Sequence, residues 1–405
     1  MKKQTKKLVG SFIVLFFISV GCMYSVSAEE QSPIVNFHST KEVGFVSLQL
    51  PEELPRFLTF FDSGYSFTYP DAVRGIYVTG NSAGGARFES LLDLVESTDL
   101  NAMVIDIKED HGYLTYRPDE DSPFYDISKN FIGDIEGMMK VLEEKQIYPI
   151  ARVVVFKDSV LAEARPDLSF KTPDGEVWKN NRGEAFVNPF LKEVWEYNVA
   201  IAEKAAQLGF QEIQFDYVRF PEGFERRDAE LQYGVGEYEG GDEDNVQKRV
   251  SAVTDFVAYA REQLEPYQVD VSVDIFGYAA TISEAPGIGQ NFSKISENVD
   301  VISSMIYPSH WTSYFGIAKP DLHPYELVDA YAKVENEVLG ALENQPVSRP
   351  WIQDFTASWL GSGNYISYGK EEVEAQIRAL QDNGINEYLI WNATNRYTPN
   401  VNYTP

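Results

Sequence analysis

Short apolar runs alternate with stretches of helical periodicity from about residue 74 to the end of the chain. Each run is a few residues long, rich in Val, Ile and aromatic residues, and bounded by polar or turn-forming residues. Continuous apolar runs of this kind are typical of strands that are buried on both faces of a parallel sheet. The pattern predicts strands that begin near Ile76, Val104, Ile150, Ile213, Val271, Val301, Trp351 and Tyr388.

The stretches between these runs carry apolar residues at the spacing of amphipathic helices. Gly209 and Gly384 follow two of them, at the place where glycine adopts the left-handed conformation that ends a helix. The stretch 290–298 is too short to predict a helix. The predicted helices cover 88–97, 132–145, 191–208, 246–264, 325–342 and 371–382.

Strands that alternate with helices in this order predict an α/β fold, a (β/α)8 TIM barrel. Only about a dozen residues follow the last strand, so we expect the last helix to be missing. The sequence shows no internal repeat and no long linker. We therefore expect a single barrel domain over 72–405, preceded by a lead-in segment, 29–71, that covers the place of the missing helix.

Two connections, after the third and fourth strands, are unusually long. The first contains Thr172-Pro173-Asp174-Gly175, a turn sequence that predicts a β-hairpin. The second, 221–245, includes the stretch EYEGGDEDN, whose composition is that of a mobile flap. Both follow the carboxyl ends of strands, where barrel enzymes build their active sites. We expect them to border a cleft.

The first 28 residues predict export from the cytoplasm. Four lysines precede an apolar run from Leu8 to Met23, and Val26-Ser27-Ala28 supplies the small residues of a signal-peptidase site. The only cysteine, Cys22, offers the alternative of a lipid anchor, although Ser19 departs from that motif. We expect a signal peptide over 1–28 and a secreted or cell-surface protein, with no transmembrane span in the mature chain.

The chain is strongly acidic, with 34 basic and 62 acidic residues and a net charge of −28. Nucleic-acid binding requires clustered Lys and Arg, so this balance argues against it. The charge also disfavours acidic glycans weakly, because local fields can differ from the net charge. Neutral or amino-sugar polysaccharides are the expected partners, and the oligomeric state does not follow from the sequence.

Carboxylates gather at the predicted strand ends. Asp216, Asp274 and Asp354 each interrupt an apolar strand, while Asp106 and Glu109 lie on or just after the second strand. A carboxylate in such a strand is costly unless it is paired, hydrogen-bonded or open to a cleft. A structural ion pair would explain any one of them, but three on the same rim favour a catalytic role.

The remaining chemistry of the chain narrows the reaction class. The chain has four histidines, and none has the spacing of a zinc motif, which argues against metal-dependent hydrolysis. A serine triad is also poorly supported. The sequence has no GxGxxG and no GxxxxGK[ST] motif, which argues against dinucleotide and phosphate-loop chemistry. Glycoside hydrolysis needs only two carboxyl groups, and no cofactor or metal. A non-catalytic carbohydrate-binding barrel and, less favoured, a polysaccharide deacetylase remain alternatives.

Aromatic and polar residues near the same rim are the candidates for substrate binding. Sugar rings pack their C–H faces on aromatic planes, and their hydroxyl groups need polar partners. Trp391 fits a core or a site role equally well. The substrate-binding candidates are Asp106, Glu109, Tyr217, Arg219, Tyr307, His310, Trp311, Trp178, Trp359 and Asn392.

Four segments resemble a glycoside hydrolase domain family of secreted bacterial proteins. They are RGIYVTG, the run that ends in QEIQFDYVRFP, VSVDIFGY and MIYPSHW. The resemblance covers about residues 72–398. It implies a distant similarity to the (β/α)8 glycosidases of the alpha-amylase and alpha-galactosidase types, in which the nucleophilic aspartate ends strand four. That position is Asp216 in this chain.

The same resemblance implies roles for the other two aspartates, with one departure. The amylase-type acid/base is a glutamate at the end of strand five, where this chain has Asp274, and the galactosidase-type acid comes from strand six, where this chain has no carboxylate. Asp354 matches the third, transition-state-stabilising carboxylate. We therefore expect a retaining mechanism in which Asp216 is the nucleophile and Asp274 the acid/base.

Overall fold

The computed structural model describes residues 34–36, 45–47, 60–240 and 242–405. The chain divides into two compact units, Met1–Pro55 and Arg56–Pro405. In the first unit, strand β1 (Ile34–Asn36) pairs antiparallel with β2 (Phe45–Ser47). The predicted signal peptide and Cys22 lie outside the described residues, and everything below concerns the second unit.

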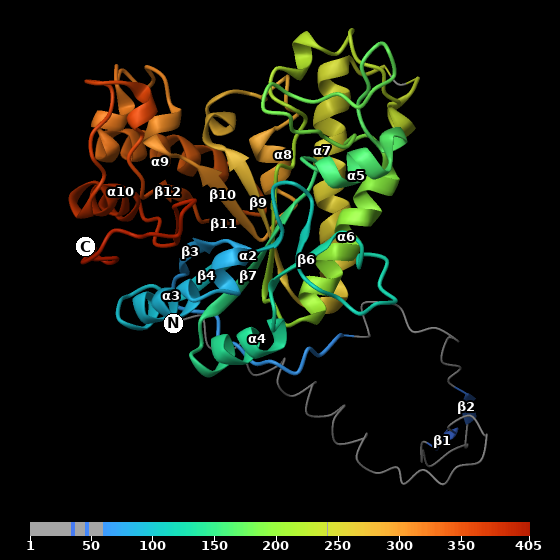
Figure 1. The fold of residues 1–405 in the computed structure, drawn as a ribbon, viewed down its shortest axis with the longest axis horizontal. Coiled ribbons are helices and arrows are strands. Elements are labelled where there is room, and N and C mark those ends of the chain that lie inside the picture. Colours follow the sequence, from blue (N-terminus) through green and yellow to red (C-terminus); the bar gives the residue numbers. More distant parts are fainter. Residues whose placement is uncertain (1–33, 37–44, 48–59, 241) are drawn as a thin grey trace. The chain divides into compact units, whose positions relative to one another are not determined.

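Eight parallel strands form a closed barrel in the second unit (Figure 1). Each strand pairs with its neighbour, and β3 closes the ring by pairing with both β13 and β4. All eight predicted strands and the predicted (β/α)8 barrel are confirmed. In chain order the barrel strands are β3 (Arg74–Val78), β4 (Ala102–Lys108), β7 (Tyr148–Val154), β8 (Glu212–Asp216), β9 (Asp270–Phe276), β10 (Val301–Met305), β12 (Trp351–Gln353) and β13 (Tyr388–Trp391).

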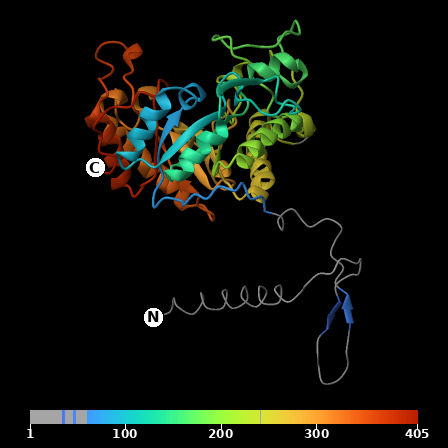
Figure 2. The ribbon, with the colours of Figure 1, turned by 60° about the horizontal axis from the view of Figure 1, so that its bottom comes forward.

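Helices surround the barrel and bury their apolar faces against it (Figures 1 and 2). The six predicted helices are α3 (Arg87–Glu96), α4 (Ile135–Glu144), α6 (Lys192–Gln207), α7 (Asn245–Leu264), α9 (Pro324–Gly340) and α10 (Lys370–Asp382). Three shorter helices join them: α2 (Gly80–Ala83), α5 (Ser159–Ala164) and α8 (Phe292–Ser296), the last within the stretch that was too short to predict. Short strands β5 (Leu114–Tyr116), β6 (Ser128–Ile132) and β11 (Val347–Ser348) extend the sheet.

No helix follows β13 among the described residues, as the sequence predicted. The end of the chain covers this side: Tyr403 is buried, its carbonyl accepts a hydrogen bond from Tyr388, and Asn402 bonds to Glu374 on α10. Most of the predicted lead-in segment lies outside the described residues. Its described part bonds to the α4–β7 connection, as the Thr68 amide does to Gln146, and to Glu387 before β13, through the hydroxyl of Tyr69.

The long connection after β7 forms the predicted hairpin. Lys171 pairs antiparallel with Val177, and Gly175, at φ +90°, allows its N–H to donate to the carbonyl of Thr172. The connection after β8 is anchored by Phe224, which is fully buried and packs on Phe170 at 4.8 Å between ring centroids. Two loops that the sequence places far apart therefore meet on one rim of the barrel.

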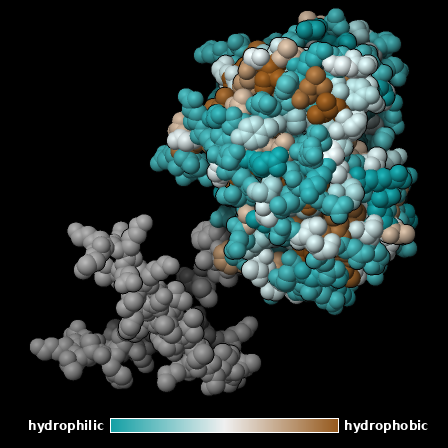
Figure 3. Space-filling model, turned by 90° about the vertical axis from the view of Figure 1, so that its left-hand side faces the viewer, coloured by the Kyte–Doolittle hydropathy of each residue, from teal (hydrophilic) through white to brown (hydrophobic). Residues whose placement is uncertain are grey.

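The surface is mostly hydrophilic, as Figure 3 shows for one face, with apolar residues gathered in small patches. Within the described part of the chain, no helix combines the length and the apolar character that crossing a membrane requires.

Candidate active site

Asp216 and Asp274 lie side by side at the carboxyl ends of β8 and β9. Phe215 pairs with Val273 in the parallel register, so the next residues on the two strands are these two aspartates. Because alternate residues of a strand face the same side, both carboxyl groups point into the barrel. Both are buried, and both line a cavity of about 690 Å³.

Arg152, on β7, is the centre of the charge network below this cavity. Its Nε and Nη2 both donate to Oδ2 of Asp216, at 3.0 and 2.6 Å, and its Nη2 also pairs with Asp110 at 2.9 Å. Its Nη1 donates to Asp106 at 2.7 Å. The guanidinium is 1% exposed, so water screens these ion pairs little. Arg152 thus holds the Asp216 carboxylate in place.

Asp274 has different surroundings from Asp216. Its Oδ1 accepts a hydrogen bond from the indole N–H of Trp351 at 2.7 Å, and no cation pairs with it among the described residues. Burial raises the pKa of Asp274 well above its usual value, and the nearby charge of Asp216 raises it further. The two aspartates therefore differ: Asp216 pairs with a guanidinium, whereas the raised pKa of Asp274 favours its protonated form.

Aromatic side chains form the walls around the two carboxyl groups. Trp351 and Trp391 meet edge to face at 5.5 Å between ring centroids, and Tyr77 stacks on Trp391 at 4.1 Å. Tyr307 lines the same cavity, and burial raises the pKa of its hydroxyl well above the usual value, so this group stays protonated at neutral pH. These rings offer planar surfaces to a sugar.

Tyr217 and Arg219 bring the end of β8 over the cavity. Tyr217 adopts φ +53°, a left-handed conformation that is unfavourable for a residue with a side chain and that turns the chain sharply after Asp216. The guanidinium of Arg219 lies 4.7 Å from the ring centroids of both Tyr217 and Phe276. Local backbone strain is thus found next to the proposed nucleophile, as is common at functional sites.

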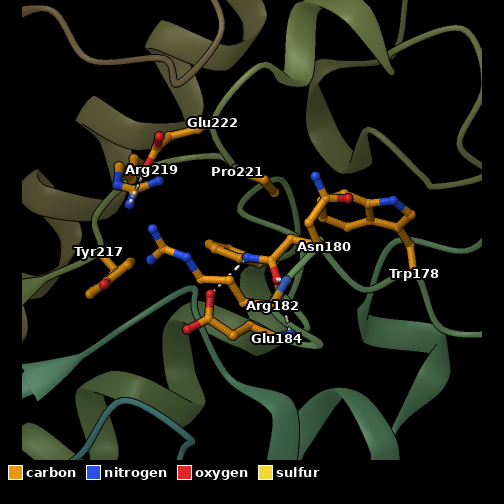
Figure 4. A pocket seen from close by; sticks show the side chains of 10 residues that line it. Trp178, Asn180, Arg182, Glu184, Tyr217, Arg219, Pro221 and Glu222 are labelled. Carbon is orange, nitrogen blue, oxygen red and sulfur yellow. Dashed lines mark hydrogen bonds and ion pairs between the residues drawn. The ribbon is translucent and has the colours of Figure 1, made fainter. Parts of the chain in front are cut away.

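A second, smaller cavity of about 190 Å³ adjoins the first, and we call it the hairpin pocket (Figure 4). Residues from the connection after β7 form one wall of it, and residues that follow β8 form the other. Its lining residues are Trp178, Asn180, Asn181, Arg182, Glu184, Phe186, Tyr217, Arg219, Pro221 and Glu222.

Most of the residues that the sequence singled out lie together at these cavities. Trp178 contributes to the hairpin pocket, with its indole largely buried against Phe186. Those at the main cavity are Asp216, Asp274, Tyr217, Arg219, Tyr307, His310 and Trp311. Burial lowers the pKa of His310, which favours its neutral form.

Asp354 and Asn392 are placed differently from the expectation. Neither lines the main cavity or the hairpin pocket, and both oxygens of Asp354 are occupied by Thr398, whose amide donates at 2.8 Å and whose hydroxyl donates at 2.6 Å. The side chain of Asn392 bonds to the backbone of Asp354 and Arg396. Both residues fasten the end of the chain to the barrel, so the third catalytic role expected for Asp354 has no geometric support.

Three further candidates also lie away from the cavity wall. Asp106 lies beneath it, bonded to Arg152 and to the hydroxyl of Tyr77, and burial raises its pKa to about 6. Glu109 closes a turn by accepting the amides of His111 and Tyr113. Trp359 is 64% exposed and stacks on Phe355 at 5.8 Å.

Sequence reasoning missed four residues that the site contains. Arg152 interrupts the apolar run IARVVVF in the same way that the aspartates interrupt theirs, and this signal could have identified it. Trp351 was regarded only as the start of a strand. Asp110 and Arg182 lie in loops, where no periodicity indicates which way a side chain points.

Comparisons with known proteins agree with the barrel fold. Residues 75–397 match the family described as "Putative glycosyl hydrolase domain". The glycoside hydrolase domain of PgaB (BpsB) from Bordetella bronchiseptica is similar in fold, with a TM-score of 0.55 and 16% identity over 80% of this chain and 94% of that one. No curated protein matches.

Two further structures are similar, one over about half of this chain and the other over about two thirds of its own. A hypothetical protein from Ruminiclostridium thermocellum is 33% identical over 49% of this chain and 96% of its own, with a TM-score of 0.42. An alpha-galactosidase from Thermus thermophilus, in complex with stachyose, is 13% identical over 83% of this chain and 64% of its own, with a TM-score of 0.48. The family match spans most of the chain, and the chain therefore belongs to this family of glycosyl hydrolase domains.

Proposed function

We propose that the protein is a secreted glycoside hydrolase that cleaves a polysaccharide or a cell-envelope glycan by a retaining mechanism. The observation that carries the proposal is the pair formed by Asp216 and Asp274. They are neighbours in register, they share one cavity, and they differ in their surroundings: Asp216 is ion-paired with Arg152, while burial raises the pKa of Asp274 well above its usual value. A glycosidase needs one ionised and one protonated carboxyl group at the scissile bond.

In this mechanism Asp216 attacks the anomeric carbon and forms a covalent glycosyl intermediate, while Asp274 protonates the leaving oxygen. Asp274, then ionised, removes a proton from the water that releases the sugar. Arg152 orients the Asp216 carboxylate, and Trp351 orients the Asp274 carboxyl group through its N–H. Tyr307 and Trp391 are placed to contact the sugar ring.

The strand geometry supports retention over inversion. Neighbouring strands lie about 4.8 Å apart, so two level, inward-pointing aspartates hold their carboxyl groups at a comparable separation. Retaining enzymes place the two groups about 5–5.5 Å apart, and inverting enzymes about 6.5–9.5 Å apart. Export of the mature chain is part of the proposal, supported by the pattern of residues 1–28.

The test uses purified 29–405 with a panel of α- and β-linked polysaccharides and cell-wall glycans, and mass spectrometry of the released sugars. We expect Asp216→Asn to abolish release and Asp274→Asn to lower it strongly, and we expect azide to rescue the second variant alone on substrates with a good leaving group. Asp119→Asn, an exposed aspartate away from the cavities, is the matched control.

Two results would contradict the proposal in different ways. A first-formed product of inverted anomeric configuration, observed by proton NMR, would refute the retaining mechanism. Undiminished release by Asp216→Asn would refute the assigned pair. Glycan binding without release by the wild-type protein would favour the non-catalytic carbohydrate-binding barrel.

A further inference from the structure

The hairpin pocket is continuous with the catalytic cavity. Four residues line both: Arg182, Tyr217, Arg219 and Glu222. A sugar chain that places one unit over Asp216 therefore has space for another unit beside the hairpin. Glycosidases bind sugars through aromatic surfaces and hydrogen-bonding side chains, and Trp178, Asn180 and Asn181 supply both to this pocket.

The charged residues that line the hairpin pocket are two arginines, Arg182 and Arg219, and two glutamates, Glu184 and Glu222. Glu184 accepts a hydrogen bond from Asn180 at 2.7 Å and pairs at 2.9 Å with Lys157, which also pairs with Asp110 at 3.0 Å. Arg219 and Glu222 approach each other at 3.4 Å. The guanidinium of Arg182, by contrast, has no ion pair and no hydrogen bond among the described residues.

Arg182 is also directed at the place where the two cavities join. It stands at the tip of a second turn after β7, which Asn180 fixes by accepting the amides of Arg182 and Glu184 at 2.9 and 3.0 Å. In Figure 4 its side chain extends from this turn toward Tyr217 and Arg219. The side chains of Arg182 and Arg219 thus lie where the two cavities join, since both residues line both cavities.

We propose that the hairpin pocket is a second sugar-binding subsite, which takes a sugar unit that carries a carboxylate and pairs it with Arg182. The inference rests on the proposed function and adds a substrate class to it, an acidic glycan. A guanidinium matches a carboxylate because it donates two parallel hydrogen bonds to the two oxygens.

The net charge of the whole chain does not oppose this local pairing. Charges farther away than about 8–10 Å are screened at physiological ionic strength, so distant acids act weakly on a bound carboxylate. Within that range the pocket lining holds two arginines and two glutamates, and Arg182 is the one of these four whose charged group has no ion pair among the described residues.

The test measures binding without turnover, in the Asp216→Asn background. The probes are a tetragalacturonate and a hyaluronan tetrasaccharide, each compared with its carboxyl-reduced counterpart by isothermal titration calorimetry. We expect at least one acidic probe to bind about tenfold more tightly than its reduced counterpart, and to bind more weakly as sodium chloride is raised. Arg182→Gln should abolish this difference.

Arg378→Gln is the matched control, because Arg378 is a half-exposed arginine on α10 outside both cavities, and it should leave the difference unchanged. Equal affinity for acidic and reduced probes, no binding of either acidic probe at millimolar concentration, or a preference that persists in Arg182→Gln would each overturn the subsite. Release of neutral oligosaccharides by the wild-type protein would leave the proposed glycosidase function standing in that case.

Discussion

Lys108 and Asp158 form an ion pair inside the protein whose loss we expect to cost more stability than that of any surface pair. Their charged atoms lie 2.6 Å apart, and both side chains are 0% exposed. The Lys108 ammonium also donates to the carbonyl of Val154 and to Asn198, each at 2.9 Å. A β-bulge between Asp106 and Lys108 accompanies this arrangement.

Lys108→Met removes the positive charge and leaves Asp158 buried without its partner. Breaking one side of a buried ion pair typically costs about 3–5 kcal/mol, because the remaining charge stays desolvated. Burial already raises the pKa of Asp158, and Lys108 opposes that rise. Without Lys108 the carboxyl group protonates more readily, so the loss should be smaller at pH 5 than at pH 8.

The assay is urea unfolding followed by far-ultraviolet circular dichroism, at both pH values. Lys140→Met, on the exposed face of α4, is the control and should change the free energy of unfolding by less than about 0.5 kcal/mol. The double variant Lys108→Met/Asp158→Asn, in which neither charge remains, should recover about half of the loss or more. A single variant that loses less than about 1 kcal/mol, or a double variant no better than the single one, would refute the reasoning.

Three further predictions concern the site and its support. Trp351→Phe removes the N–H that favours the ionised form of Asp274. The alkaline limb of the pH profile of kcat/KM should therefore move up by about one pH unit. A limb that stays in place or moves down would contradict this role of Trp351. Burial and neighbouring acids raise the pKa of Asp270 to about 6, so its ionisation destabilises the fold above that pH. Asp270→Asn should therefore raise the free energy of unfolding by about 1–2 kcal/mol at pH 7.5 and leave it unchanged at pH 4. Equal effects at the two pH values would contradict this prediction. Gly112→Ala, at φ +107°, brings a Cβ to 2.0 Å from Oδ1 of Asp158 and should lower the thermal midpoint by several degrees.

The barrel could be predicted from the sequence because its signal is distributed over the whole chain. Each strand is buried on both faces and therefore apolar throughout, and each helix repeats its apolar face several times, so no single residue decides the result. The pairing of Asp216 with Asp274 also followed, since both end apolar strands that are adjacent in the barrel order.

The sequence did not predict which way individual side chains point. Asp354 gave the same signal as Asp216, yet it follows the end of β12 and bonds to Thr398 rather than facing the cavity. A strand pattern that is apolar on both sides cannot tell an inward position from an outward one. Arg182 depends on a turn in a long connection, and the position of such a side chain is fixed by contacts that no local pattern records.

The missing eighth helix has a consequence for how the barrel moves. Elsewhere a helix with its own ladder of hydrogen bonds covers each junction, but the junction between β13 and β3 is covered by an extended segment held by individual side-chain bonds. That junction has three paired positions, Tyr388 with Arg74, Leu389 with Gly75 and Ile390 with Ile76, whereas β4 and β7 share six. We expect this seam to open before the junction between β7 and β8, which has five paired positions, so its amide protons should be replaced by deuterium sooner in native-state hydrogen exchange.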